Sequence, residues 1–224
     1  MKYLAVLFLM LAVGAAEAVE LQGRMTQGGL IQGKTEPGAT VSLDGKALRV
    51  SREGYFVFGF GREAPPKAIL SVRLSDGGVS EQTLSIKPRK YRIQRIDGLP
   101  SKMVTPPPEV LARIKADRAL VAETRKRDSE NLFFLSDWIR PADGPVTGVY
   151  GSQRILNGKP RQPHYGIDFA GRTGSPLIAT AGGAVALAPD AMDSPGGTLI
   201  LAHADALNQA ISHIRSACCK RGET

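Results

Sequence analysis

Cysteine and histidine are scarce in this chain of 224 residues. The chain has two cysteines and three histidines, and the cysteines, Cys218 and Cys219, are neighbours in the sequence. Adjacent cysteines would close a strained ring, and they lack the spacing of zinc-binding cysteine pairs. The cysteines therefore indicate neither a disulfide framework nor a zinc site, and metal chemistry is left to histidines and carboxylates.

Long apolar runs are also scarce. Residues 4 to 13 are apolar throughout, but they are too few to span a bilayer comfortably. Lys2 gives this segment a positive start, and Ala16-Glu17-Ala18 fits the small-x-small cleavage pattern. We expect a signal peptide over residues 1 to 18 and a mature chain that begins at Val19, with an uncleaved anchor as the alternative. This prediction implies a periplasmic or secreted protein without a stable transmembrane anchor.

Acidic residues are outnumbered. The chain has 29 Lys and Arg against 21 Asp and Glu, which gives a net charge of +8 and a pI of about 9.7. This charge favours an anionic partner: nucleic acid, lipid headgroups or an acidic wall polymer. The basic residues are scattered and rarely lie beside aromatic residues, and the chain carries an export signal. We therefore expect no nucleic-acid partner.

Three parts follow the signal peptide, and together they predict a mainly β protein. Residues 19 to 87 alternate apolar and polar positions between turn signals such as Asp44-Gly45-Lys46 and Asp76-Gly77-Gly78, which is typical of a small β-sandwich. No residue in this part is catalytic by type. It could bind wall polymer, cover a groove or act as a spacer, and the sequence leaves these alternatives open.

Residues 88 to 137 are predicted to be a Pro-rich and helical linker. Thr105-Pro106-Pro107-Pro108 sets an extended piece and then a helix start, because proline is tolerated in the first helical turn. Apolar residues spaced among charges predict a polar, amphipathic helix from Glu109 through Asn131.

From Trp138 to the end, at residues 138 to 224, short strands broken by glycine and proline predict an antiparallel β domain, with strands at 177–180, 183–187, 198–201 and 209–214.

One pair of side chains in this last part suits a metal. His164 and Asp168 lie four positions apart with Gly166 midway, and both side-chain types bind zinc. Extended chain would separate them by about 13 Å, at roughly 3.3 Å per residue, so a shared ion requires a bent backbone. Gly166 is expected to offer that bend because it tolerates unusual dihedrals and adds no side chain near the metal. The alternative is a loop histidine beside a solvated aspartate.

The surrounding sequence resembles a known family. Val146-Thr147-Gly148-Val149-Tyr150-Gly151-Ser152-Gln153-Arg154 precedes the pair, Pro163-His164-Tyr165-Gly166-Ile167-Asp168-Phe169-Ala170 contains it, and a Gly- and Ala-rich stretch from Thr173 to Val185 follows it. This order resembles the lysostaphin-type zinc endopeptidases, which cut peptide cross-links in bacterial cell-wall peptidoglycan. The resemblance runs from about Trp138 to the end of the chain.

The resemblance implies a role for each histidine. It makes His164 and Asp168 the first two zinc ligands. It places His213 on a strand that faces the scissile bond, where the histidine stabilises charge in the transition state. It leaves His203 structural.

The family also requires a third zinc ligand and a further catalytic histidine from a downstream His-x-His motif. No histidine follows His213, and the chain as given stops at Thr224. We therefore expect an incomplete peptidase domain, from a truncated or a degenerate member. Two functions remain open: an exported zinc metallo-endopeptidase of the peptidoglycan hydrolase type, impaired in this chain, or a non-catalytic periplasmic module that binds peptidoglycan or activates a hydrolase.

Overall fold

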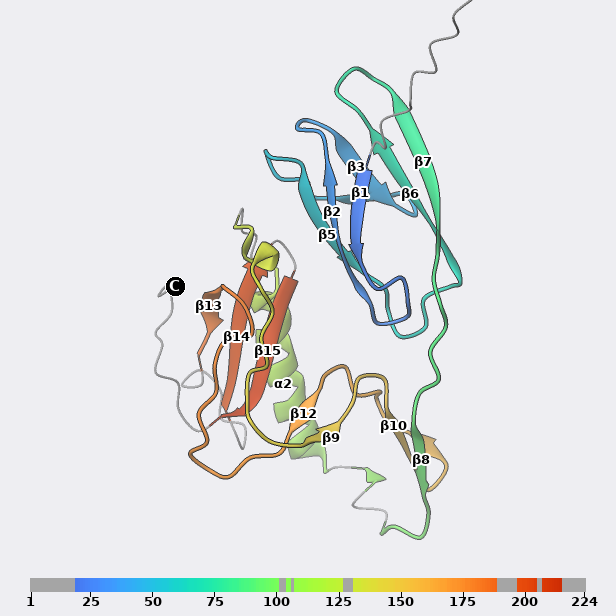
Figure 1. Ribbon diagram of the computed structural model, residues 1–224. Helices are drawn as coiled ribbons and strands as arrows, with labels where there is room; N and C mark the ends of the chain where they lie inside the picture. Colours follow the sequence, from blue (N-terminus) through green and yellow to red (C-terminus); the bar gives the residue numbers. More distant parts are fainter. Residues whose placement is uncertain are drawn as a thin grey trace, which may run out of the picture.

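The computed structural model describes residues 19–100, 104–105, 107–126, 131–188, 197–204 and 207–214. The predicted signal peptide and both cysteines lie outside these residues. The described chain forms two β-rich regions joined by an extended connector (Figure 1). The first, residues 19–86, is here named the sandwich region, and the second, residues 131–214, the C-terminal region.

Two antiparallel sheets form the sandwich region. One sheet has the order β1 (Val19–Gly23), β2 (Leu30–Thr35), β5 (Tyr55–Gly59). The other has the order β4 (Lys46–Leu48), β3 (Thr40–Leu43), β6 (Lys67–Arg73), β7 (Val79–Ser85). The mainly β fold predicted from the sequence is confirmed.

The core of this sandwich comes from alternate residues of facing strands. Phe56 and Phe58 from β5 meet Leu70 and Val72 from β6, and each is at most 6% exposed. This spacing follows from the two-residue period of a strand, which sends every second side chain to the same face. Gly33 on β2 has no room for a side chain, because a Cβ there would lie 2.1 Å from the Phe56 ring.

The predicted turns set the register of the sheets. Asp44 and Gly45 both have positive φ, 47° and 76°, as a two-residue turn between β3 and β4 requires. Residues 74 to 78 join β6 to β7, which pair over their whole length, from Lys67 with Ser85 to Arg73 with Val79. Both hairpins were predicted from these turn residues.

The connector contributes a strand to the region that follows it. β8 (Ile93–Ile96) lies inside the predicted linker and pairs in parallel with β10 (Gln153–Leu156), so that Ile93 lies opposite Gln153. β11 (Lys159–Pro160) completes this small sheet through a turn at Asn157 and Gly158, whose φ values are 47° and 75°. Segments about sixty residues apart are thus held side by side.

Helix α2 spans Pro108–Thr124 and differs from its prediction in two ways. It ends well before Asn131, because residues 123 to 131 contain no apolar side chain that a further turn could bury. It is also less amphipathic than predicted, since Val110, Leu111 and Leu120 are 42%, 46% and 36% exposed.

Among the described residues, no helix is long and apolar enough to cross a membrane.

A three-stranded antiparallel sheet forms the centre of the C-terminal region: β13 (Ala184–Leu187), β14 (Gly197–Ala204) and β15 (Leu207–Ile214). Helix α2 covers one face, where its Val121 packs with a cluster around the fully buried Ile200 (Figure 1). Val185, Leu199 and Leu201 form a separate cluster with Ile211. Two shorter elements complete the region, the 3₁₀ helix η1 (Phe133–Leu135) and the pair of β9 (Val146–Gly148) with β12 (Asp168–Phe169).

The strand predicted at residues 177–180 is absent; this segment of the structure has no regular strand. Its backbone makes two bonds with the chain near Pro141: Ile139 N–H donates to Thr180 O at 2.7 Å, and Ile178 N–H donates to Pro141 O at 2.9 Å. Proline has no N–H to return, so the ladder cannot extend into a regular strand.

Candidate functional site

The structure brings together the two side chains that the sequence singles out. His164 Nε2 lies 3.2 Å from Asp168 Oδ1. The His164 side chain is 34% exposed and that of Asp168 is 61% exposed, so the pair opens to solvent. The three-residue segment between them is therefore bent, as a shared ion requires, and the extended separation is excluded.

The geometry of the pair fits a metal better than a hydrogen bond. Nε2 of His164 is buried, yet no donor or acceptor makes a hydrogen bond to it with proper geometry. Two ligands of a tetrahedral zinc, each about 2.0–2.1 Å from the ion, would lie about 3.3 Å apart. The observed separation of 3.2 Å matches that spacing. A buried nitrogen without a hydrogen bond, beside a carboxylate oxygen, is a suitable donor set for zinc.

A short strand pair sets the position of Asp168. Asp168 begins β12 and lies opposite Gly148, the last residue of β9. A Cβ at Gly148 would lie 2.1 Å from Oδ2 of Asp168 and 2.8 Å from its Cγ. The carboxylate thus occupies the space that a side chain at position 148 would take. The sequence alone does not indicate this role, because Gly148 and Asp168 lie far apart in the chain and meet only through the pairing of β9 with β12.

Gly166 does not have the dihedral role predicted for it, although a Cβ there would lie 3.8 Å from Nε2 of His164. Its φ lies outside the left-handed region, and a Cβ there would lie 3.5 Å from the nearest atom of the His164 ring, which is ordinary contact. The bend between His164 and Asp168 therefore needs no glycine for its dihedrals. The glycine that the site requires is Gly148, on the neighbouring strand.

Two backbone hydrogen bonds fix the loop that carries His164. Gly151 N–H donates to His164 O at 2.7 Å, and His164 N–H donates to Ser152 O at 2.8 Å. Gly151 has a φ of 84°, and a Cβ there would lie 2.0 Å from the Tyr91 ring. A glycine is needed at this position for its conformation and for the close approach of Tyr91.

The sandwich region contacts this loop through an arginine. Arg62, whose side chain is only 10% exposed, donates from Nε to Gly151 O at 2.9 Å, and its guanidinium lies 4.5 Å from the centre of the Tyr91 ring. Tyr91 in turn donates its hydroxyl to Arg62 O at 3.1 Å. A chain of contacts therefore leads from the sandwich region through Arg62 and Gly151 to His164.

Three tyrosines extend this contact. The Tyr91 and Tyr150 rings lie 6.4 Å apart, and Tyr150 lies 6.0 Å from Tyr165, the neighbour of His164. Burial of Tyr150, together with the nearby Tyr91 and Tyr165, raises the pKa of its hydroxyl above the ordinary value of 10.0. Tyr150 is therefore an uncharged phenol at neutral pH.

The other two histidines have different surroundings. His203 is 1% exposed on β14, where Nδ1 contacts Gly182 O, Nε2 lies 3.3 Å from Gln209 Oε1, and the ring lies 5.0 Å from Trp138. These contacts suit the structural role predicted for it. His213 lies on β15 between Ser212, which pairs with Thr198, and Ile214, which pairs with Gly197. Its side chain is outside the part that the structure describes, so its predicted role stays a prediction.

Within the described ranges, no group of three or more His, Cys, Asp or Glu side chains could hold a metal ion. His164 and Asp168 are thus the two donors that these residues bring together.

Comparison with known proteins adds two similarities, although no family model matches the chain. The fold is that of a crystal structure described as a candidate M23 peptidase from Pseudomonas aeruginosa, with a TM-score of 0.60 and 24% identity over 89% of this chain and 78% of that one. The chain therefore has the fold of a lysostaphin-type peptidase, as its resemblance predicted.

In sequence, the chain is 31% identical over 89 residues to a lipoprotein NlpD/LppB homologue of Pseudomonas aeruginosa. The matched part is 40% of this chain and spans only 28% of that relative.

Proposed function

We propose that this protein is a zinc metallo-endopeptidase of the cell-wall type, directed at peptidoglycan peptide cross-links and impaired in this chain because no His-x-His motif follows His213. The observation that carries this proposal is the pair of His164 and Asp168, whose facing atoms are 3.2 Å apart with Nε2 buried and without a hydrogen bond. The fold shared with a candidate M23 peptidase supports it. The sequence similarity to a lipoprotein of the NlpD/LppB type supports a place in the cell envelope, in keeping with the predicted export.

Each residue of the site has a defined task in this proposal. His164 binds zinc through Nε2 and Asp168 through its carboxylate, while Gly148 leaves the space in which that carboxylate lies. Bound zinc supplies a Lewis acid for the peptide carbonyl and lowers the pKa of a water. His213 on β15 donates a hydrogen bond to the oxygen that gains charge during peptide cleavage. Two protein ligands bind zinc more weakly than three, so we expect weak zinc binding by this chain.

Metal analysis and a wall-digestion assay test the proposal together. The purified chain is loaded with zinc and dialysed, and its zinc content is measured beside dye release from labelled peptidoglycan. The unchanged chain is expected to bind zinc weakly and to release no measurable dye. His164→Ala and Asp168→Asn are expected to lose the zinc, while Tyr165→Phe, a matched change on the same loop, keeps it. Equal zinc content in His164→Ala and the unchanged chain would show that the pair does not bind the metal.

A second function is favoured by one observation: the described residues bring together two metal donors and not three. In this alternative the protein is a non-catalytic module that binds peptidoglycan or activates a hydrolase. Co-sedimentation with purified sacculi separates the two functions. Sedimentation without dye release supports the module, and dye release that requires His164 supports the endopeptidase. A chain that neither sediments with sacculi nor releases dye would contradict both functions.

A further inference from the structure

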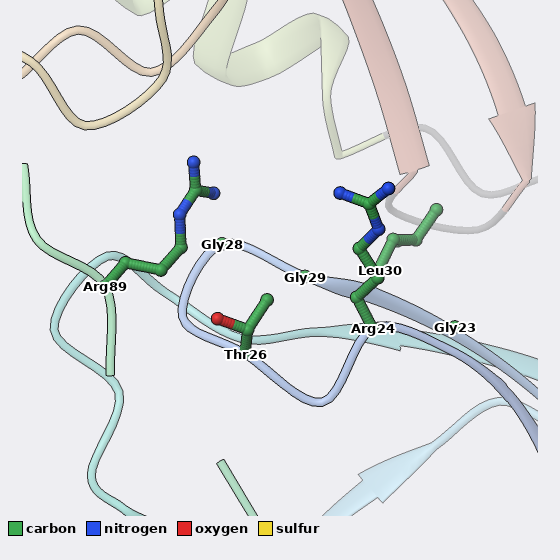
Figure 2. A pocket seen from close by; sticks show the side chains of 7 residues that line it. All are labelled: Gly23, Arg24, Thr26, Gly28, Gly29, Leu30 and Arg89. Atoms are coloured by element: carbon green, nitrogen blue, oxygen red, sulfur yellow. The ribbon is translucent and has the colours of Figure 1, made fainter. Parts of the chain in front are cut away.

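A hollow of about 550 Å³ lies at the turn between β1 and β2, away from the His164–Asp168 pair. It is lined by Gly23, Arg24, Thr26, Gly28, Gly29, Leu30 and Arg89 (Figure 2). Two arginines and no acidic residue are among them. The volume suits a small molecule or a short peptide segment.

Both arginines point their charge to the same side of the turn. Figure 2 shows the guanidinium groups of Arg24 and Arg89 rising on one side, with the Gly28–Gly29 backbone running between them. Neither guanidinium pairs with a carboxylate within the described part of the chain. A hollow with two positive groups on one side and no acidic residue in its lining is suited to an anion.

The frame of the hollow is rigid. Gly28 N–H donates to Phe60 O at 2.9 Å and Gly29 N–H donates to Thr26 O at 2.8 Å. The backbone N–H of Arg89 donates to Gln27 Oε1 at 3.0 Å. The guanidinium of Arg89 lies 5.9 Å from the centre of the Tyr150 ring. These contacts hold the backbone of the turn in place, while the side chains of Arg24 and Arg89 are exposed and Arg89 Nη1 donates to Gln27 O at 3.4 Å.

One wall of the hollow leads toward the candidate zinc pair. A Cβ at Gly28 would lie 2.5 Å from the Tyr150 ring, so Tyr150 lies directly against this turn. Tyr150 also lies 6.0 Å from Tyr165, which precedes the segment from Gly166 to Asp168. A branched or extended ligand can therefore contact the hollow and the pair by passing along these tyrosines.

We propose that this hollow binds a carboxylate of the acidic peptide in the wall polymer, with Arg24 and Arg89 as its two contacts. The planar guanidinium donates two parallel hydrogen bonds that match a carboxylate. The hydroxyl of Thr26 donates to Lys87 O at 2.9 Å, which leaves its lone pairs free to accept a peptide N–H. The inference deepens the proposed function, because it rests on a wall peptide as the substrate.

Binding of soluble wall fragments tests this site apart from catalysis. The probes are fragments released from purified sacculi, and the same fragments after their carboxyl groups have been converted to amides. Binding to the zinc-free full chain is measured by titration calorimetry. Arg24→Glu is expected to weaken binding of the acidic fragments about tenfold, as loss of a charged hydrogen bond followed by repulsion predicts. Arg89→Lys is expected to weaken binding of the acidic fragments about threefold, because the positive charge stays but the paired N–H donors of the guanidinium are lost.

Arg73→Glu is the matched control. It makes the same charge change on β6, beside the β6–β7 turn at the far end of the sandwich region (Figure 1). Equal weakening by Arg24→Glu and Arg73→Glu would reduce the effect to net charge and overturn the site, as would equal binding of the amidated fragments. Competition by inorganic phosphate as strong as that by acetate would also count against a carboxylate site.

Failure of this carboxylate site and failure of the proposed endopeptidase function give different experimental results. Binding that depends on Arg24 in a chain that neither keeps zinc nor digests peptidoglycan would support this site and remove the endopeptidase. Digestion that depends on His164, with fragment binding indifferent to Arg24, would do the reverse.

Discussion

The sandwich region and the C-terminal region differ in how they are held together. In the sandwich, one continuous cluster of eleven buried side chains joins both sheets. In the C-terminal region the described buried hydrophobic residues form two small clusters of three, around Leu199 and around Ile200, and Phe134 and Ala181 lie outside both. The candidate site lies outside both clusters and is held by backbone bonds and close glycine contacts. Stability and chemistry therefore depend on different residues, and substitutions should separate them.

The largest effect is expected in the sandwich core. Phe56→Ala removes a side chain that is 1% exposed and should lower the free energy of unfolding by about 3–5 kcal/mol. Trp138, the only tryptophan, lies in the C-terminal region, so its fluorescence follows that region, while far-UV circular dichroism follows both. The dichroism midpoint should fall more than the fluorescence midpoint. Equal shifts would show that the two regions unfold as one unit, and Ile69→Ala, 49% exposed, serves as the control.

The second effect concerns metal and leaves stability nearly unchanged. In Gly148→Ala the new methyl group displaces the Asp168 carboxylate, because the side chain can rotate away at little cost. Zinc affinity should fall about 10- to 100-fold, as for other groups that orient metal ligands. Gly166→Ala is the matched control, since its methyl group meets only ordinary contact. Calorimetric zinc titration of both variants decides whether Gly148 or Gly166 is the glycine that the site requires.

A smaller effect should follow from cutting the contact between the regions. Arg62→Ala removes the donor to Gly151 O and should cost the loop about 1–2 kcal/mol. Hydrogen exchange should then become faster at the amides of Gly151 and His164, while the Phe60 amide, bonded to Gly29 O within the sandwich, keeps its protection. Arg52→Ala, a change on the surface of the sandwich, should leave all three amides unchanged. Faster exchange at Phe60 as well would mean that Arg62 supports the sandwich and not the loop alone.

The smallest effect is a dependence on alkaline pH. Burial raises the pKa of the Tyr150 hydroxyl in the folded chain, so this group stabilises the fold fully below its ordinary value of 10.0. That contribution is lost as the pH rises through the folded pKa. Thermal unfolding measured below and above pH 10.0 should therefore show a steeper alkaline loss for the unchanged chain than for Tyr150→Phe. Identical slopes would remove Tyr150 as the cause.

Local chemistry explains which features could be predicted from the sequence. Asp44-Gly45 and Asp76-Gly77-Gly78 specify turns by themselves, because their residue types favour the positive φ or tight geometry that the turns adopt. His164 and Asp168 could also be predicted as a pair from the sequence, since they lie close together in the chain and have side chains suited to zinc. Such features depend on a few neighbouring residues, and the structure has them where the sequence placed them.

The missed features depend on residues far apart in the chain. Gly148 matters to the candidate pair through β12, which brings Asp168 across from it, and the segment at 177–180 pairs with a chain segment interrupted by Pro141. The contact of Arg62 with Gly151 spans 89 positions. No local pattern contains this information. The helix end at Thr124 was the exception, since the polar run that follows it was visible in the sequence.

The parallel pairing of β8 with β10 has a consequence for the order of folding. Each sandwich hairpin closes over a few residues, whereas β8 and β10 enclose about sixty, including the whole of α2. Closing a loop of that length costs on the order of 3 to 4 kcal/mol in chain entropy before any contact compensates for it. Pairings between distant segments form slowly for this reason. The sandwich should therefore be complete while the loop that carries His164 is still unformed, and the metal pair is among the last features of the molecule to assemble.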